Sequence, residues 1–306
     1  MASSDDTNTD PNAKRTAPRM RFLVVAVVLV AAGVGARKAW DSMHASLASS
    51  PRYKLTAAVL QITPDTPTWI RADVKAQVLR DAGLTDSLSL LEPPEVIQQR
   101  LVDAFELHPW IRKVEKVVLA GPGRIEMTVS YRQPIAVAEV TAAGQTNLVL
   151  LDTDAVRLPD GNLTDVHKSY LPRISDIHER PQEGDAWSDA RVRGAAALAT
   201  QLGGVWERLS LLEIVPSPHP EILRANRYYT YDIRATYGTV IHWGAAPGYD
   251  PPGESPFQEK LSRLTGWIEQ NGSLDSLNSP QSIDVRDSLY IEKRIAKQDD
   301  SDEVVR

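Results

Sequence analysis

The sequence predicts an α+β protein in three parts: an N-terminal transmembrane helix, a small domain with the order β-α-α-β-β, and a β-rich second domain with one or two helices. Three observations carry this prediction. An uncharged apolar run occupies residues 22–36, and helical and strand-like spacings of apolar residues alternate from 55 to 140. Two amphipathic helical patterns, near 188–202 and 256–270, interrupt shorter strand-like stretches in the remainder.

Length and composition narrow the range of functions. The 306 residues exceed one ordinary domain of roughly 100 to 200 residues, so two folded units with terminal tails are expected. The formal net charge is -6 at pH 7, which offers no basic surface to a polyanion, so no nucleic-acid partner is expected. The absence of cysteine excludes disulfides, thiol nucleophiles and cysteine-ligated metal sites.

The N-terminal apolar segment is interpreted as a single membrane anchor, predicted at residues 21–40. Its uncharged run lies between Arg21 and Arg37 and is shorter than the roughly 20 residues that cross a hydrocarbon core, so both arginines must reach toward the interfaces. Two alternatives stay open. A signal peptidase could cleave after Ala36 or Ala48, or the run could be a buried helix of a soluble protein.

The charges beside this segment favour a cytoplasmic N-terminus. Lys14, Arg15, Arg19 and Arg21 precede it and Arg37 with Lys38 follow at once, although Arg52 and Lys54 also lie within reach. Residues 1–20 are polar and are predicted to be a disordered cytoplasmic tail. The bulk of the chain is then expected on the periplasmic or extracellular side of the cell inner (plasma) membrane. Residues 296–306 are predicted to be a disordered acidic tail.

The small domain is predicted at residues 51–133. Residues 55–62, LTAAVLQI, alternate like a strand that Pro64 ends, and apolar residues then recur every four positions up to Gly83, as in a helix. A second helix opens at residues 93–94, because proline suits the first turn, where its missing N–H has no intrahelical partner.

This second helix carries an apolar face and stops at Pro109. The residues of the face are Ile97, Leu101, Ala104 and Phe105. Trp110 and Ile111 are expected to fold back over the small core as buried side chains.

Two strands close the small domain. VEKVVLA at 114–120 and RIEMTVSY at 124–131 are joined by Gly121-Pro122-Gly123, whose residues suit a tight connection between antiparallel partners. Pro134 then introduces the strand IAVAEV, the start of the β-rich domain predicted at residues 134–295.

These features together resemble a POTRA domain. Such domains combine a helix ending in a Pro-Trp-Val/Ile step, a V-x-x-V strand, a Pro-Gly-like turn, an I-x-V strand and an R-x-P-[VI]-A sequence. The matching positions are Pro109-Trp110-Ile111, Val114 to Val117, Gly121-Pro122-Gly123, Ile125 to Val129 and Arg132-Gln133-Pro134-Ile135-Ala136. With the apolar segment before this domain and a long region after it, the whole chain resembles the FtsQ/DivIB family of bacterial cell-division proteins.

Three later stretches are similar to sequences of the same family. Leu150-Leu151-Asp152 followed by Val156 resembles the first strand of its second domain. Residues 239–244, followed by a helix with Lys260, resemble its glycine-and-helix block, and residues 282–286 resemble its terminal strand.

The chain also departs from the family pattern. Ala155 replaces a turn glycine, Tyr131 stands where an acidic residue often precedes the arginine, and Asp287 occupies the place of an aromatic residue after Asp-x-Arg. The last change puts a transferred partner contact in doubt, because the contact would have to pass to Tyr290.

The resemblance implies a non-catalytic divisome scaffold that links cytoplasmic-side and periplasmic division proteins and helps coordinate septal peptidoglycan synthesis at the division site. The implied partners are other divisome membrane proteins, bitopic coiled-coil subunits, which add a strand to the final strands of the scaffold. By position, the partner-binding residues are Asp284, Arg286, Ser288, Leu289, Tyr290 and Ile291. The POTRA core and motif residues are Phe105, Pro109, Trp110, Ile111, Arg132 and Pro134.

Structural roles compete with several of these assignments. Arg132 is more often a hydrogen-bonding residue that closes the domain than a partner contact. Asp284 and Arg286 alternate with apolar residues and can pair across strands. Asp152 begins a stretch like a calcium loop, but Arg157 stands where the loop needs glycine, so a turn acid is favoured.

No sequence pattern typical of an enzyme is present. The six histidines form no HExxH motif and no pair four residues apart, and neither a Gly-x-Ser-x-Gly motif nor a phosphate-binding glycine loop occurs. No cofactor, metal or small-molecule substrate is expected. Two other classes stay open: a POTRA-containing protein of envelope assembly or secretion, which requires a C-terminal barrel, and a membrane-tethered enzyme, which requires a pocket of converging ionisable groups.

Overall fold

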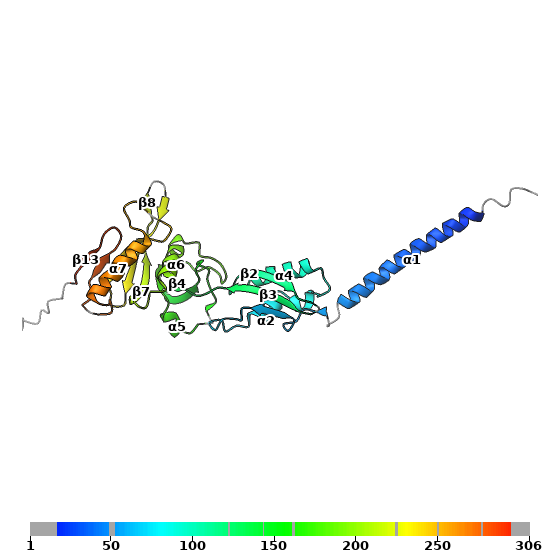
Figure 1. Ribbon diagram of the computed structural model, residues 1–306, viewed down its shortest axis with the longest axis horizontal. Coiled ribbons are helices and arrows are strands. Elements are labelled where there is room, and N and C mark those ends of the chain that lie inside the picture. Colours follow the sequence, from blue (N-terminus) through cyan, green and yellow to red (C-terminus); the bar gives the residue numbers. More distant parts are fainter. Residues whose placement is uncertain are drawn as a thin grey trace, which may run out of the picture.

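The computed structural model of the chain describes most of its residues, namely 17–48, 53–121, 123–142, 144–160, 163–223, 226–249, 251–276 and 278–294. Within them the chain is mixed α+β, with a large β-sheet. Figure 1 shows helix α1 at one end, a small unit in the middle and a β-rich unit at the other end. The predicted acidic tail, and most of the predicted N-terminal tail, lie outside the described residues.

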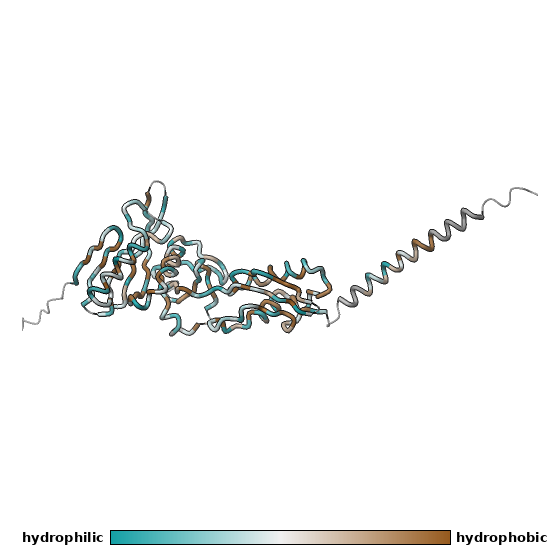
Figure 2. Tube along the Cα trace, viewed as in Figure 1, coloured by the Kyte–Doolittle hydropathy of each residue, from teal (hydrophilic) through white to brown (hydrophobic). Residues whose placement is uncertain are grey.

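The predicted fold class needs one correction, because its transmembrane helix is wrong. The segment is helical, and α1 spans Ala17–Ala48. Nevertheless, no helix among the described residues combines the length and the apolar character that a membrane crossing requires. The uncharged run between Arg21 and Arg37 has 15 residues, fewer than the roughly 20 that cross a hydrocarbon core. Figure 2 shows hydrophobic residues in the middle of α1. The predicted cellular location is not decided by this finding and stays a prediction.

A three-stranded sheet forms the centre of the small unit. β1 (Leu60–Thr63) pairs parallel with β3 (Ile125–Tyr131), and β2 (Ile111–Leu119) pairs antiparallel with β3. The strand order is therefore β1-β3-β2. The first strand starts later than the alternation predicted, because Leu55 enters the core from a loop, where its N–H donates to the carbonyl of Leu88 (3.2 Å).

Three helices belong to this unit: α2 (Val74–Asp81), α3 (Leu84–Ser87) and α4 (Pro94–Glu106). α2 begins after the predicted start because Asp73 caps it, accepting a hydrogen bond from the Ala76 N–H (3.0 Å). Gly83, with φ of 60°, takes the left-handed conformation that separates α2 from α3. α4 begins at the predicted proline and buries its apolar face.

The β-rich unit is built on an eight-stranded sheet with the order β13-β12-β11-β10-β7-β6-β4-β5. Its strands are β4 (Ala136–Ala142), β5 (Gln145–Leu151), β6 (Arg173–Ile177), β7 (Leu211–Pro216), β10 (Thr230–Ala235), β11 (Val240–Ala245), β12 (Ser282–Asp284) and β13 (Tyr290–Glu292). A separate hairpin consists of β8 (Glu221–Leu223) and β9 (Asn226–Tyr228). The helices are α5 (Asp165–Ser169), α6 (Ala190–Leu202) and α7 (Phe257–Asn271), the last two at the predicted helical patterns.

Helices α6 and α7 share one hydrophobic core with one face of this sheet. Buried residues of α6, such as Leu198, and of α7, such as Leu264, pack in the same cluster as Ile214, Ile233 and Ile283 of the strands. The packing on α6 is close, since a Cβ added at Gly194 would lie 2.0 Å from the hydroxyl oxygen of Tyr231.

The β4–β5 hairpin joins the two units because its two faces enter different cores. Val137 and Leu150 are register partners, and both belong to the core of the small unit, together with Leu158. Their neighbours Ala138 and Val149, which are also paired, belong to the core of the β-rich unit. The two units are therefore connected by buried side chains and not only by the chain.

Candidate functional site

The final strands lie at one end of the eight-stranded sheet. β12 pairs parallel with β11, and β13 pairs antiparallel with β12. The strand order ends at β13, which has a neighbour on one side only among the described strands. The structure therefore places the last described strand at a sheet edge. Figure 1 shows this edge at the end of the molecule opposite α1.

The backbone of Ile291 faces the open side of β13. The Val285 N–H donates to the His242 carbonyl on β11 (3.3 Å), whereas Asp284 beside it is the register partner of Tyr290 on β13. At the start of β12, the Gln281 carbonyl accepts from β11 and its N–H donates to the Glu292 carbonyl of β13 (2.8 Å). Because successive residues of a strand turn their N–H and C=O groups to opposite sides, the middle residue of β13 presents both groups to the edge. An added strand would bond to Ile291.

The side chains of the predicted partner-binding residues divide between surface and core. Tyr290 is 67 % exposed and Leu289 is 42 % exposed. Ser288 is exposed, whereas Ile291 packs against the core of the β-rich unit. An added strand therefore meets an aromatic and an aliphatic side chain beside the open backbone.

Asp284 and Arg286 bind each other. The Asp284 carboxylate accepts hydrogen bonds from the Arg286 N–H (3.0 Å) and from its guanidinium group, with Nη2 at 2.6 Å. Burial acts to raise the pKa of the Asp284 carboxyl, but the hydrogen bonds and charge of Arg286 outweigh it and hold this pKa below its ordinary value. The pair shapes the turn that leads into β13, so the two residues bind each other and do not pair across strands as the alternation had suggested.

This pair predicts a pH-dependent stability. A carboxyl whose folded pKa is depressed stabilises the fold above its unfolded pKa of about 3.9 and loses that contribution as the pH falls through the folded value. Asp284→Asn, which keeps an acceptor for the Arg286 N–H, should therefore lower the melting temperature at pH 7 and match the wild type near pH 2. Thermal unfolding across this pH range measures the difference. A constant difference at all pH values would contradict the assignment.

A polar row crosses the exposed face of the sheet and ends at Tyr290. Asp232 on β10 is opposite His242 on β11, His242 is opposite Asp284 on β12, and Asp284 is opposite Tyr290 on β13. His242 Nδ1 lies 2.9 Å from a carboxylate oxygen of Asp232. Sequence reasoning missed Asp232 and His242, because only the register of separate strands brings them together.

A buried ion pair holds β11 beneath this edge. The Lys260 ammonium, on α7, donates to Glu254 Oε1 (2.6 Å) and to the carbonyls of Trp243 (3.1 Å) and Ala245 (3.3 Å). Gly244 has φ of 86°, and a Cβ there would lie 2.4 Å from Glu254 Oε1, so only glycine fits. This explains the glycine and the lysine of the family-like block as parts of one structural anchor.

Arg132 joins the small unit to the β-rich unit. Its backbone N–H donates to the Trp110 carbonyl (2.9 Å), and its guanidinium binds Asp152 Oδ2 (2.6 Å). Asp152 is 1 % exposed, and its other oxygen accepts from the N–H groups of Asp154 (3.0 Å) and Val156 (2.8 Å). These hydrogen bonds give Asp152 the role of a turn acid.

The other POTRA motif residues lie in or beside the same junction. Phe105, Trp110 and Ile111 are buried in the core of the small unit, as expected. Pro109 lies against the β-rich unit, where a Cβ added at Gly184 would be 3.5 Å from its Cγ. Pro134 is half-buried. These residues therefore lie in the small unit and at its junction with the β-rich unit, away from β13.

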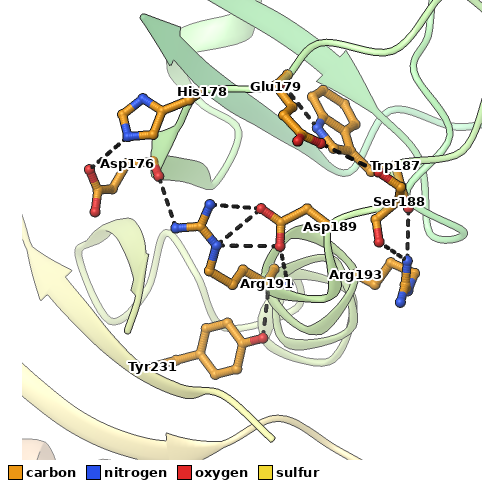
Figure 3. A network of polar contacts seen from close by, with 9 residues as sticks. All are labelled: Asp176, His178, Glu179, Trp187, Ser188, Asp189, Arg191, Arg193 and Tyr231. Atoms are coloured by element: carbon orange, nitrogen blue, oxygen red, sulfur yellow. Dashed lines mark hydrogen bonds and ion pairs between the residues drawn. The ribbon is translucent and has the colours of Figure 1, made fainter. Parts of the chain in front are cut away.

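A second polar network anchors the start of α6 (Figure 3). Asp189 caps the helix by accepting from the Arg191 N–H (2.8 Å), and the Arg191 guanidinium binds the same carboxylate. The Tyr231 hydroxyl donates to the Arg191 carbonyl (3.1 Å), and burial raises the pKa of this phenol. The network fixes α6 against β10.

Figure 3 also shows how the titratable side chains near this helix are arranged. His178 lies 3.9 Å from Asp176, whereas the Ser188 hydroxyl is directed to Glu179 (3.4 Å). Ser188 and His178 thus have different partners, and they do not form the hydrogen-bonded pair of a nucleophile and its base. No cluster of three or more potential metal ligands occurs in the part of the chain that the structure describes.

Comparison with known proteins gives no further assignment. No protein-family model matches the chain, and no curated protein matches it. The resemblance to the FtsQ/DivIB family therefore stays a prediction from the motifs.

Proposed function

We propose that this chain is a non-catalytic scaffold of bacterial cell division, which binds an extended segment of another division protein at the open edge of β13. The observation that supports this proposal best is the open edge itself. By its register in β13, Ile291 presents its backbone N–H and C=O groups to this edge, next to the exposed side chains of Leu289 and Tyr290. Backbone pairing supplies affinity in such complexes, and neighbouring side chains supply specificity.

The connection between the two units supports a scaffold. The buried β4–β5 hairpin and the Arg132–Asp152 contact tie the small unit to the β-rich unit. The edge is thereby held at a fixed place relative to the small unit. The proposed partners are other divisome membrane proteins, with bitopic coiled-coil subunits as the expected class, and the proposed site of action is the division site.

A test separates the edge backbone from the edge side chains. Ile291→Pro removes the outward N–H, and proline is tolerated where an edge N–H faces solvent. Ile291→Val retains the N–H. In dividing cells of the source organism, a fluorescent fusion of the full chain should gather at the division site, and only the valine variant should sustain division when the native copy is depleted.

Two further variants guard against misfolding. Deletion of residues 288–306 removes the whole edge strand, and the double change Leu289→Ala with Tyr290→Ala alters side chains only. Circular dichroism verifies each fold. If a folded deletion variant supports division as well as the wild type does, partner binding at β13 is excluded.

A further inference from the structure

A basic and apolar groove runs beside β13. It has a volume of about 640 Å³ and lies between the end of α7 and the final strand. The residues that matter for its chemistry are Trp267, Asn271, Pro280, Ile291, Lys293 and Arg294. Among the described residues that line it, the groove thus combines an apolar floor with two cations and has no carboxylate.

The two cations of the groove are not neutralised by the described part of the chain. Neither Lys293 nor Arg294 forms an ion pair with a described residue. The Arg294 guanidinium donates to the carbonyl of Tyr237 (2.9 Å), a neutral acceptor. The groove therefore suits an extended segment in which carboxylates stand next to small apolar side chains.

The chain itself carries such a segment. Residues 297–306 read KQDDSDEVVR, so four carboxylates precede two valines. Two residues separate this segment from Arg294, which lines the groove. Ten residues reach at most about 35 Å when extended, which is enough to fold back along a groove that starts at their own attachment.

We propose that residues 296–306 bind the groove beside β13 and compete there with the partner segment. The carboxylates of Asp299, Asp300, Asp302 and Glu303 pair with Lys293 and Arg294, and the valine pair contacts the apolar floor. This deepens the proposed function and rests on it, since the tail regulates access to the same edge. Covalent attachment makes the competition effective even when the contact is weak, because it gives the tail a local concentration of about a millimolar.

The test uses a fluorescein-labelled synthetic peptide of residues 297–306 and fluorescence anisotropy. The full chain that lacks only residues 296–306 should bind the peptide. The intact chain should bind it at least about tenfold more weakly, because its own tail occupies the groove. Affinity for the shortened chain should fall steeply between low and high salt, since exposed charges are screened.

Matched variants assign the contact. In the shortened chain, Lys293→Gln with Arg294→Gln should abolish peptide binding, whereas Lys113→Gln with Lys116→Gln on β2 should leave it unchanged. A peptide with Asn and Gln in place of its four acids should not bind. Failure of the shortened chain to bind the peptide, or equal binding by the intact chain, would overturn the proposal.

The peptide-binding test and the cell-division test can fail independently of each other. If β13 variants fail to sustain division while the peptide does not bind, the partner edge stands and the competing tail is refuted. If the peptide binds the groove while every folded β13 variant sustains division, the groove contact stands but its role in partner access is refuted.

Discussion

Replacing Trp110 with alanine should lower the free energy of unfolding by about 3 to 5 kcal/mol, as large aromatic truncations in cores do. The side chain is 1 % exposed and lies where α4 turns into β2. It belongs to a core that also contains Val137 and Leu150 of the β4–β5 hairpin. The cavity would therefore open in the core to which both units contribute side chains. Urea denaturation measures the change.

Two control variants make this measurement specific. Leu107 lies two residues before Pro109 and is 83 % exposed. Leu107→Ala should therefore change the free energy of unfolding by no more than about 0.5 kcal/mol. Trp110→Phe should cost less than Trp110→Ala, because the ring volume is mostly kept and the indole Nε1, which is buried without a hydrogen-bond partner, is removed. Equal stabilities of Trp110→Ala and Leu107→Ala would contradict the core assignment.

Local signals predicted the elements of the small unit well. Pro94 in the first turn and Pro109 after the last set the limits of α4, and the glycines around residue 122 mark the β2–β3 connection. The start of α2 was missed because the hydrogen bond that the Asp73 carboxylate accepts from the Ala76 N–H outweighs the apolar spacing that begins at Ile70. Spacing reports which face is buried, but a cap decides where a helix begins.

The pairing of distant strands could not be predicted from such signals. β12 pairs parallel with β11, and β4 pairs with both β5 and β6. The alternation in each strand shows two faces but not the neighbour. The row from Asp232 to Tyr290 requires the registers of three strand pairs at once.

The transmembrane prediction failed for a related reason. The predicted span reached the length of a membrane crossing only by including Arg21 and Arg37. The helix itself continues to Ala48, past the charged residues Lys38 and Asp41. An apolar run shorter than a bilayer core is compatible with several environments, so length alone could not choose among them.

Lys260→Met should destabilise the chain by about 3 to 5 kcal/mol, because breaking a buried ion pair leaves an uncompensated charge. Lys260 is 3 % exposed, and the Glu254 side chain that it binds is 11 % exposed. Methionine matches the length of the aliphatic part of the lysine side chain, but it cannot donate a hydrogen bond to Glu254 or to the two β11 carbonyls. Urea denaturation again measures the loss. The control is Lys116→Met at an exposed position of β2, which should change stability by no more than about 0.5 kcal/mol.

A double variant distinguishes the ion pair from simple packing. Glu254→Gln keeps an acceptor for the Ala245 N–H, which donates to Glu254 Oε1 at 2.7 Å, and removes the charge. Lys260→Met with Glu254→Gln should therefore recover at least about 1 kcal/mol relative to Lys260→Met alone, as coupled neighbours do. Additive effects of the two changes would mean that the charges do not interact.

The same anchor links this stability to the proposed edge. Glu254 precedes Ser255, whose N–H donates to the Arg286 carbonyl (2.7 Å) in the turn before β13. Losing the Lys260 anchor should therefore free the turn as well as β11. Hydrogen exchange measured by mass spectrometry should then rise in residues 285–292 of Lys260→Met and stay unchanged in α4. If exchange rises equally in both regions, the anchor supports the whole fold and has no special role at the partner edge.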